Sequence, residues 1–311
     1  MNKIDFAFLD SGTGGIPYML YLREKIPNCN CVYLGDTAHF PYGQKSPKEI
    51  TECAALSIDL ILKKWNPKTI VIGCNTISVT ALDELRKLFP FTPIVGTVPA
   101  IKLAASVTKN KRIGLLATNA TVKHPYCQNL INNFASDCKV FSFADPNLIS
   151  FVEKNLFKSS EDEKIKAVLP DVNFFKQNDC DVIILGCTHF THLAKEFSLA
   201  ASPEIQIVDS REGVVKQAIR VENSSAFADF ENSASLTKNL SASSQSFKSS
   251  AEIAASSAKV FAKKVSTSAT SAEVLSLKSF TFFVTKANQN EINEYKILCE
   301  NLNIPWGGVI S

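Results

Sequence analysis

The chain has 311 residues, with 33 Lys and Arg against 30 Asp and Glu, and a formal net charge of +3. So small a charge gives no electrostatic footprint for nucleic acid or for an anionic membrane surface, and we expect neither as a partner. No apolar run reaches about 18 residues, and the segment 1–9 alternates charged and apolar residues too quickly for a signal peptide. We therefore expect a soluble, cytoplasmic protein. Its length fits one large α/β domain or, as we expect here, two smaller lobes.

Apolar or β-branched segments alternate along the chain with segments of helical periodicity. The predicted strands are 4–9, 31–34, 69–72, 112–116, 139–143 and 182–185, with a returning strand at 280–285. The predicted helices are 16–25, 47–64, 78–88, 120–134, 161–177 and 211–221, with a last helix at 291–301. Such alternation is typical of βαβ units around parallel sheets.

Two of the predicted strand ends resemble each other. Segment 69–72 runs into Gly73-Cys74-Asn75-Thr76, and segment 182–185 runs into Gly186-Cys187-Thr188-His189. This duplication predicts an α/β fold of two pseudo-symmetric lobes, each with a mostly parallel sheet flanked by helices. Each lobe would present one cysteine to a cleft between them.

We expect lobe one to hold residues 1–97 plus 209–311 and lobe two to hold residues 98–208. Lobe one would contain an insertion at about 224–279, where serine takes 17 of 56 positions. Its composition indicates a surface segment, of which 251–264 has helical periodicity.

The glycine-rich segment Asp10–Gly15 directly follows the first predicted strand. Glycines allow a sharp turn and let backbone amides come close to a ligand. Pro17 stands where a dinucleotide fingerprint needs a third glycine, and no Lys-Ser/Thr pair completes a P-loop. A tight turn and an anion-binding loop both fit, and Asp10 at a strand's carboxyl end favours a ligand site. The polar loop 35–43 is placed to lie over the same crevice.

Nine cysteines without regular spacing indicate free thiols in a reducing compartment. Cys74 and Cys187 stand out because each precedes a helix start, where free amides lower a thiol pKa and attract carboxylates. His189 adds a proton partner two residues after Cys187. A metal site built from these three residues and His192 is the competing interpretation. We expect no metal, since Cys-x-His spacing is not a recurrent zinc pattern.

Taken in chain order, a set of short motifs carries a resemblance to a known family. These are Asp10–Gly15, Gly35-Asp-Thr-Ala with Pro41-Tyr42-Gly43, Cys74-Asn75-Thr76, 114–126 with Thr118 and Thr121, Glu153, and Gly186-Cys187-Thr188-His189. In this order they resemble the glutamate racemases of the aspartate/glutamate racemase superfamily. The resemblance covers most of residues 4–222 and resumes near 280.

The resemblance implies racemisation of L- and D-glutamate without pyridoxal phosphate or any other cofactor, supplying D-glutamate for peptidoglycan, in an enzyme that often forms homodimers. Cys74 would take the α-proton from D-glutamate with the help of Asp10, and Cys187 would take it from L-glutamate with the help of His189. The implied substrate contacts are Asp10, Ser11, Pro41, Tyr42, Gly43, Cys74, Asn75, Thr76, Thr118, Thr121, Glu153, Cys187, Thr188 and His189.

Two alternatives stay open. An aspartate racemase of the same superfamily would use the same thiols, although His189 argues against it because the aspartate relatives resemble Cys-Thr-Glu at that step. A non-catalytic module that binds an acidic metabolite is the second. Three features depart from the family pattern: His124 replaces a common serine, Thr191-His192 replaces Pro-Leu, and the serine-rich insertion is foreign to it.

Overall fold

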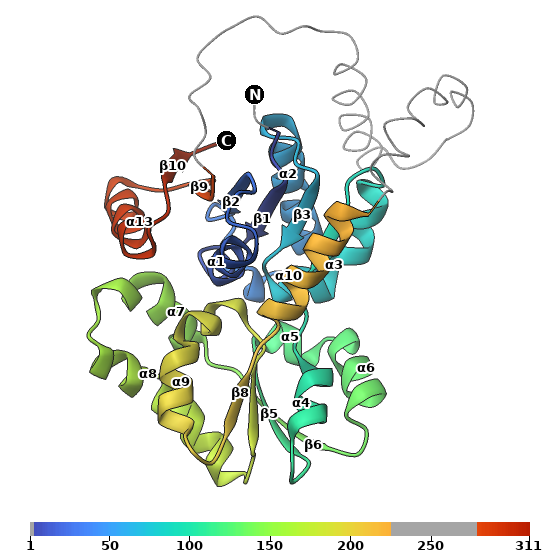
Figure 1. Ribbon diagram of the computed structural model, residues 1–311, viewed down its shortest axis with the longest axis vertical. Coiled ribbons are helices and arrows are strands. Elements are labelled where there is room, and N and C mark those ends of the chain that lie inside the picture. The colour runs from blue at the N-terminus through green and yellow to red at the C-terminus, as the bar shows by residue number, and fades with distance from the viewer. Residues whose placement is uncertain (1–2, 225–278) are drawn as a thin grey trace, which may run out of the picture.

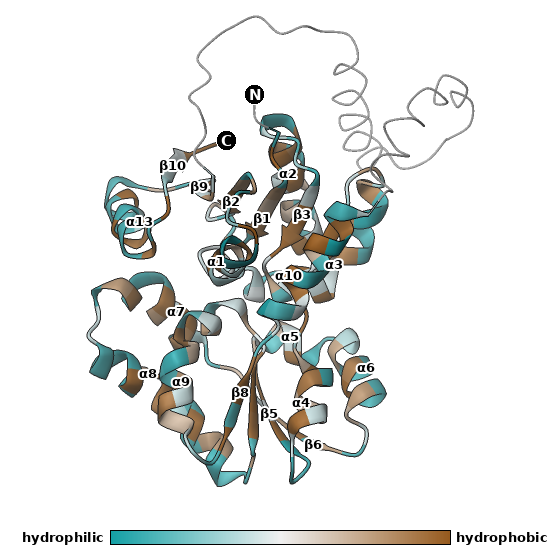
Figure 2. Cartoon of the chain, viewed as in Figure 1, coloured by the Kyte–Doolittle hydropathy of each residue, from teal (hydrophilic) through white to brown (hydrophobic). Residues whose placement is uncertain are grey.

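The computed structural model describes residues 3–224 and 279–311. They form two lobes, each built on a parallel sheet flanked by helices (Figure 1). Strands β1, β3 and β5 are predominantly hydrophobic, whereas the helices carry both hydrophobic and hydrophilic residues (Figure 2). Strands covered by helices on both faces read as continuous apolar runs, which is why the sequence predicted them.

The first sheet has six strands in the order β10-β9-β2-β1-β3-β4, all parallel. The strands are β1 (Phe6–Asp10), β2 (Cys31–Gly35), β3 (Thr69–Ile72), β4 (Ile94–Gly96), β9 (Thr281–Val284) and β10 (Trp306–Val309). One face packs against α1 (Ile16–Lys25), α10 (Arg211–Asn223) and α13 (Gln289–Leu302), and the other against α2 (Pro47–Lys64) and α3 (Asn75–Leu88).

The second sheet has four parallel strands in the order β6-β5-β7-β8. The strands are β5 (Arg112–Leu116), β6 (Lys139–Phe143), β7 (Val182–Leu185) and β8 (Gln206–Val208). Helices α4 (Ile101–Val107) and α6 (Pro125–Phe134) cover one face, and α7 (Pro146–Lys154), α8 (Glu161–Gln177) and α9 (Ala194–Ala201) cover the other.

The two lobes repeat one topology. The order β2-β1-β3-β4 in the first sheet corresponds to β6-β5-β7-β8 in the second. After β3, the amide of Gly73 donates to the carbonyl of Leu9 at 2.7 Å, and after β7 the amide of Gly186 donates to that of Leu116, also at 2.7 Å. The predicted two-lobed α/β fold is confirmed, whereas the boundaries at 97/98 and 208/209 stay predictions.

One helix that was predicted as continuous is interrupted in the structure. The segment 120–134 forms two helices, α5 (Asn119–Lys123) and α6, because the residue before a proline is pushed out of the helical region. That residue, His124, has extended backbone and accepts a hydrogen bond from the amide of Tyr126 at 3.2 Å. His124 therefore caps α6 and does not reach the site described below.

Several short elements were not predicted: β4, β8, β10, α4, α7 and α9. The third helix begins at Asn75 instead of at 78. The helix predicted at 251–264 lies outside the described residues. Within the residues that the structure describes, no helix is both long and apolar enough to cross a bilayer.

Candidate active site

A cavity of about 460 Å³ lies at the carboxyl ends of the central strands, lined by both lobes. This is the edge at which open α/β sheets bind ligands. Every site residue predicted from the sequence lines it except Asp10 and Thr121. The predicted residues that do so are Ser11, Pro41, Tyr42, Gly43, Cys74, Asn75, Thr76, Thr118, Glu153, Cys187, Thr188 and His189.

Both cysteines occupy the same local geometry. Cys74 lies between β3 and the first turn of α3, and Cys187 lies between β7 and the 3-10 helix η3 (Thr188–Leu193). Both have extended backbone and both side chains are buried, with 6% and 5% exposure. The predicted pair of thiols from equivalent turns therefore opens onto one cavity.

The Cys74 side of the cavity favours an uncharged thiol. Burial, followed by the negative charge of Asp10, raises the pKa of Cys74 well above its usual value, and the amides of Ile77 and Thr76 only partly oppose this. At neutral pH in the free protein, Cys74 is therefore protonated.

Asp10 lies behind the cavity wall. Its carboxylate accepts hydrogen bonds from the amide of Gly12 at 2.8 Å and from the hydroxyl of Thr188 at 3.0 Å. Burial raises its pKa. A direct substrate contact, predicted for Asp10, does not fit this placement, because the carboxylate is fully buried and bonded to residues of the wall itself.

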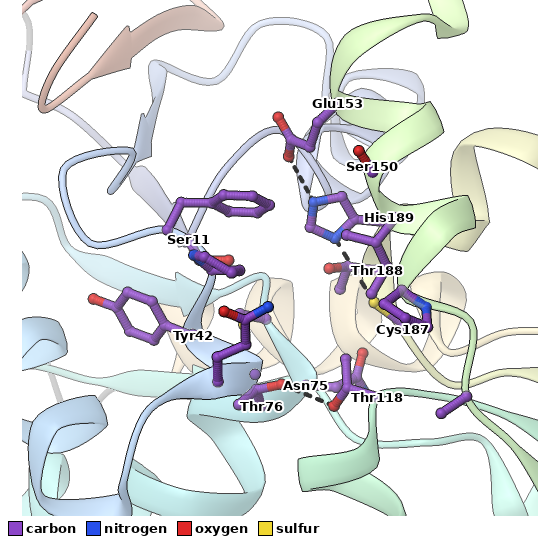
Figure 3. Close-up of a pocket in the computed structure, with 18 of the residues that line it drawn as sticks. Ser11, Tyr42, Asn75, Thr76, Thr118, Ser150, Glu153, Cys187, Thr188 and His189 are labelled. Atoms are coloured by element: carbon purple, nitrogen blue, oxygen red, sulfur yellow. Dashed lines mark hydrogen bonds and ion pairs between the residues drawn. The ribbon is translucent and has the colours of Figure 1, made fainter.

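The Cys187 side carries a charged pair. Nδ1 of His189 lies 3.7 Å from the sulfur of Cys187, and Nε2 donates to Oε1 of Glu153 at 2.6 Å (Figure 3). Burial opposes the charged form of His189, but the hydrogen bonds with Cys187 and Glu153 outweigh it, so the pKa of His189 is raised well above its usual value. The sulfur of Cys187 therefore faces a positively charged ring.

The glycine-rich loop after β1 lies directly against Glu153 and His189, and its glycines make this close approach possible. A Cβ atom at Gly12 would collide with Oε1 of Glu153, and one at Gly14 would collide with the ring of His189. Asp10–Gly15 is therefore a tight turn; because Ser11 of this turn lines the cavity, its second interpretation as a ligand loop stays a prediction.

Hydroxyl and amide groups form another part of the wall. The hydroxyls of Thr76 and Thr118 lie 3.1 Å apart, and that of Thr118 donates to Thr121 at 3.0 Å. Thr121 is buried beneath Thr118 and does not line the cavity, so it supports the wall instead of contacting a ligand as predicted. The amide of Asn75 is buried, and neither of its polar atoms has a partner among the described residues. An unpaired buried amide on a cavity wall is suited to bind a polar ligand.

The competing metal interpretation does not fit the geometry. His192 lines no part of the cavity, and its Nε2 donates to the carbonyl of Thr13 at 3.0 Å. Within residues 3–224 and 279–311, no three His, Cys, Asp or Glu side chains are grouped to hold a metal ion.

Sequence reasoning missed one wall of the cavity. This wall is the face of α7 and the residues before it. The cavity residues Phe40, Gln44 and Asn119 were also missed. The missed residues of the α7 wall are Ala144, Asp145, Pro146, Ile149, Ser150 and Lys154. Asp145-Pro146 is a helix-start signal that the sequence did offer, since Asp145 caps the amides of Asn147 and Leu148.

The sequence pattern of the Asp/Glu/Hydantoin racemase family matches residues 21–218. The chain belongs to this family. Among its relatives, the glutamate racemase of Treponema pallidum (strain Nichols) is 39% identical over 220 residues, which are 71% of this chain and 82% of the relative. The glutamate racemase of Shewanella frigidimarina is 41% identical over 210 residues, 67% and 79% of the two chains.

Solved structures of Asp/Glu racemase family members share the fold. The Escherichia coli glutamate racemase, crystallised with L-glutamate and the activator UDP-MurNAc-ala, has a TM-score of 0.74 at 22% identity over 99% of this chain and 98% of that one. The Campylobacter jejuni glutamate racemase has a TM-score of 0.57 at 25% identity over 77% and 100%.

Proposed function

We propose that the chain is a glutamate racemase that interconverts L- and D-glutamate, with Cys74 and Cys187 as the two proton-transfer groups and without a cofactor. The observation that carries the proposal is the pair of thiols, supplied by equivalent turns of the two lobes and opening onto one cavity. The curated relatives are glutamate racemases at about two-fifths identity, which identifies the substrate.

Two thiols suit the reaction because inversion removes hydrogen from one face of the α-carbon and adds it to the other. One thiolate accepts the α-proton while the opposite thiol donates its own proton to the carbanion. After each turnover the protonation states of the two sulfurs are exchanged, which is the state needed for the reverse direction.

The surroundings of the two sulfurs suggest which one starts as the base. Burial and Asp10 keep Cys74 protonated, so Cys74 is the proton donor of the free enzyme, and Cys187, whose sulfur lies beside the imidazolium of His189, takes the part of the base. In this state the free enzyme reacts with L-glutamate, with Cys187 accepting the proton and Cys74 donating one. Reaction of D-glutamate requires the opposite state, in which Asp10 would receive the proton of Cys74 or orient that thiol.

Backbone amides and uncharged polar groups would hold the substrate. The first residues of α3 and η3 line the cavity, and free amides at a helix start favour carboxylates and a developing carbanion. Asn75 and the hydroxyls of Thr76 and Thr118 offer further partners. Contact between the lobes around the substrate would exclude water.

The proposal extends to the cellular setting. The enzyme would act in the cytoplasm as a homodimer and supply D-glutamate for peptidoglycan. Sedimentation equilibrium of the purified protein tests the homodimer, with a single species of 34.0 kDa as the contrary result.

The racemase proposal is tested by isotope exchange. The protein is incubated in deuterated water with each enantiomer of glutamate, and optical rotation and the α-hydrogen NMR signal are followed together. We expect both enantiomers to lose the α-hydrogen and converge on zero rotation. Binding without exchange would support the non-catalytic module, and faster exchange of aspartate than of glutamate would support the aspartate racemase.

A further inference from the structure

Thr13, in the glycine-rich loop after β1, is bonded through both of its backbone polar atoms to side chains of the other lobe. Its N–H donates to Oε1 of Glu153 at 2.8 Å. Its carbonyl oxygen accepts a hydrogen bond from Nε2 of His192 at 3.0 Å. Thr13 therefore connects α7, which carries Glu153, with η3, which carries His192.

The same carboxylate oxygen serves the reactive end of the site. Oε1 of Glu153 accepts both from Thr13 and from Nε2 of His189, and Nδ1 of His189 faces the sulfur of Cys187. A displacement of Thr13 would move Oε1, and with it the imidazole ring that stands beside the sulfur.

His192 is suited to hold Thr13 in place. Its ring packs against Phe157, with ring centroids 6.2 Å apart in an edge-to-face arrangement. Burial lowers the pKa of His192 to about 4, so the imidazole is neutral at physiological pH. Since a carbonyl oxygen can only accept, the single hydrogen of the neutral ring lies on Nε2.

We propose that His192 is a positioning residue for the Cys187 half of the reaction, acting through its hydrogen bond to Thr13 on the Glu153–His189 pair. The inference rests on the proposed racemase function. His192 does not line the cavity, so its effect passes through Thr13 and Glu153.

The test measures α-deuterium isotope effects on kcat/KM in both directions. In the L-to-D direction Cys187 removes the isotope, and in the D-to-L direction Cys74 does. The variant His192→Leu removes the side-chain donor to the Thr13 carbonyl and leaves only the backbone amide of Ile16, at 3.1 Å, so we expect kcat/KM to fall about 10-fold to 100-fold. The isotope effect should rise with deuterated L-glutamate and fall with deuterated D-glutamate, because only the Cys187 step has become slower.

Two further variants separate the hydrogen bond from packing. His192→Gln keeps an N–H donor that reaches the Thr13 carbonyl, and we expect its isotope effects to stay near those of the unsubstituted protein. The Asn side chain of His192→Asn is polar but too short to reach the Thr13 carbonyl, so this variant should behave like His192→Leu. It takes the place of His192→Leu if the latter does not fold.

The control for stability is Thr108→Val. It removes a hydrogen bond to Asp181 at the opposite end of the second sheet, so it should lower the melting temperature and leave both isotope effects unchanged. Unchanged isotope effects in the Leu and Asn variants would overturn the role of His192. A lack of exchange in the unsubstituted protein would instead refute the racemase proposal itself.

Discussion

Nε2 of His189 lies 2.6 Å from Oε1 of Glu153. Burial raises the pKa of Glu153, but the hydrogen bond and charge of His189 outweigh it, so that pKa ends below its usual value while the pKa of His189 ends well above its own. The stability that Glu153 contributes is lost as pH falls through its lowered pKa. The contribution of His189 is present below pH 6.5 and is lost as pH rises through its raised pKa. The ion pair is therefore fully formed between these two limits, which include neutral pH.

Removing the charge of Glu153 should lower the pKa of its partner. In Glu153→Gln we expect the pKa of His189 to fall and racemisation to slow by about 10-fold or more, since the imidazolium beside Cys187 is lost. NMR titration of the histidine ring signals measures this directly. Glu163→Gln, which removes a capping-box carboxylate of α8, is the matched control and should leave His189 unchanged. An unaltered His189 titration in Glu153→Gln would contradict the assignment.

Each reactive thiol should be indispensable. A serine hydroxyl is a far weaker acid than a thiol, so Cys74→Ser and Cys187→Ser should each reduce racemisation by at least about 100-fold. Cys127→Ser, at a buried position in α6 that does not line the active-site cavity, is the control and should retain activity. Polarimetry with each enantiomer makes the comparison. Full activity in either active-site variant would rule out the two-thiol mechanism.

The close approach of His189 to Gly14 gives a prediction that depends on space and not on a hydrogen bond or a charge. In Gly14→Ala the new Cβ would displace the ring of His189, and we expect turnover to fall about 100-fold, as small misplacements of catalytic groups do. The same substitution at Gly213, in α10, meets nothing within 4 Å and should raise the stability by up to about 1 kcal/mol. Initial rates and thermal melts of both variants test these two expectations. Equal activity in the two would show that His189 does not need its present position.

Lys154 is the only lysine or arginine among the described residues that line the cavity. Its positive charge attracts a substrate that carries two carboxylates. In Lys154→Gln we expect KM for glutamate to rise about 2-fold to 5-fold, with a weaker dependence on salt, as for other exposed charge interactions. Lys164→Gln, in α8, provides the comparison, because Lys164 pairs with Glu161 and does not line the cavity. A KM equal to that of the control at low salt would remove Lys154 from substrate attraction.

Asp171 should make the fold less stable as the pH rises. Burial first, and then the nearby carboxylate of Asp145, raise the pKa of Asp171 from 3.8 to about 8. Between pH 3.8 and about pH 8, Asp171 is ionised in the unfolded chain but still protonated in the folded one, so stability falls with rising pH. Asp171→Asn removes this dependence, and we expect its stability relative to the unsubstituted protein to improve by about 1–3 kcal/mol from pH 5 to pH 8. Denaturant titrations at the two pH values test this, and a constant difference would contradict it.

The central strands were readable from the sequence because strands buried on both faces leave continuous apolar segments. The segments 69–72, 112–116 and 182–185 match β3, β5 and β7 at both ends. The segment 139–143 also matches β6 at both ends, although β6 is a partly buried edge strand. The edge strands β4 and β8 have only three residues each, and β10 contains two glycines, so none of them leaves such a signal. The break at His124 is a local effect of Pro125 that helical periodicity hides.

The cavity residues that were predicted from the sequence are mainly those that come directly after a strand. Cys74 and Cys187 each end a strand, and parallel strands bring such positions to one edge. The α7 wall was missed because its residues reach the cavity from one face of a helix. Likewise, the contacts of Asp10 with Thr188 and of Thr13 with His192 join different lobes. They depend on how the lobes pack, which no local pattern encodes.

The two sulfurs sit in matching turns but have unlike neighbours, Asp10 for one and His189 for the other. However unequal these flanks are, catalysis cannot favour either product, because mirror-image amino acids have the same free energy in water. The ratio kcat/KM must therefore be identical for both enantiomers at every pH. In kcat and KM the inequality can appear only as a compensated difference, in which the enantiomer that saturates the enzyme at lower concentration is also the one that turns over more slowly.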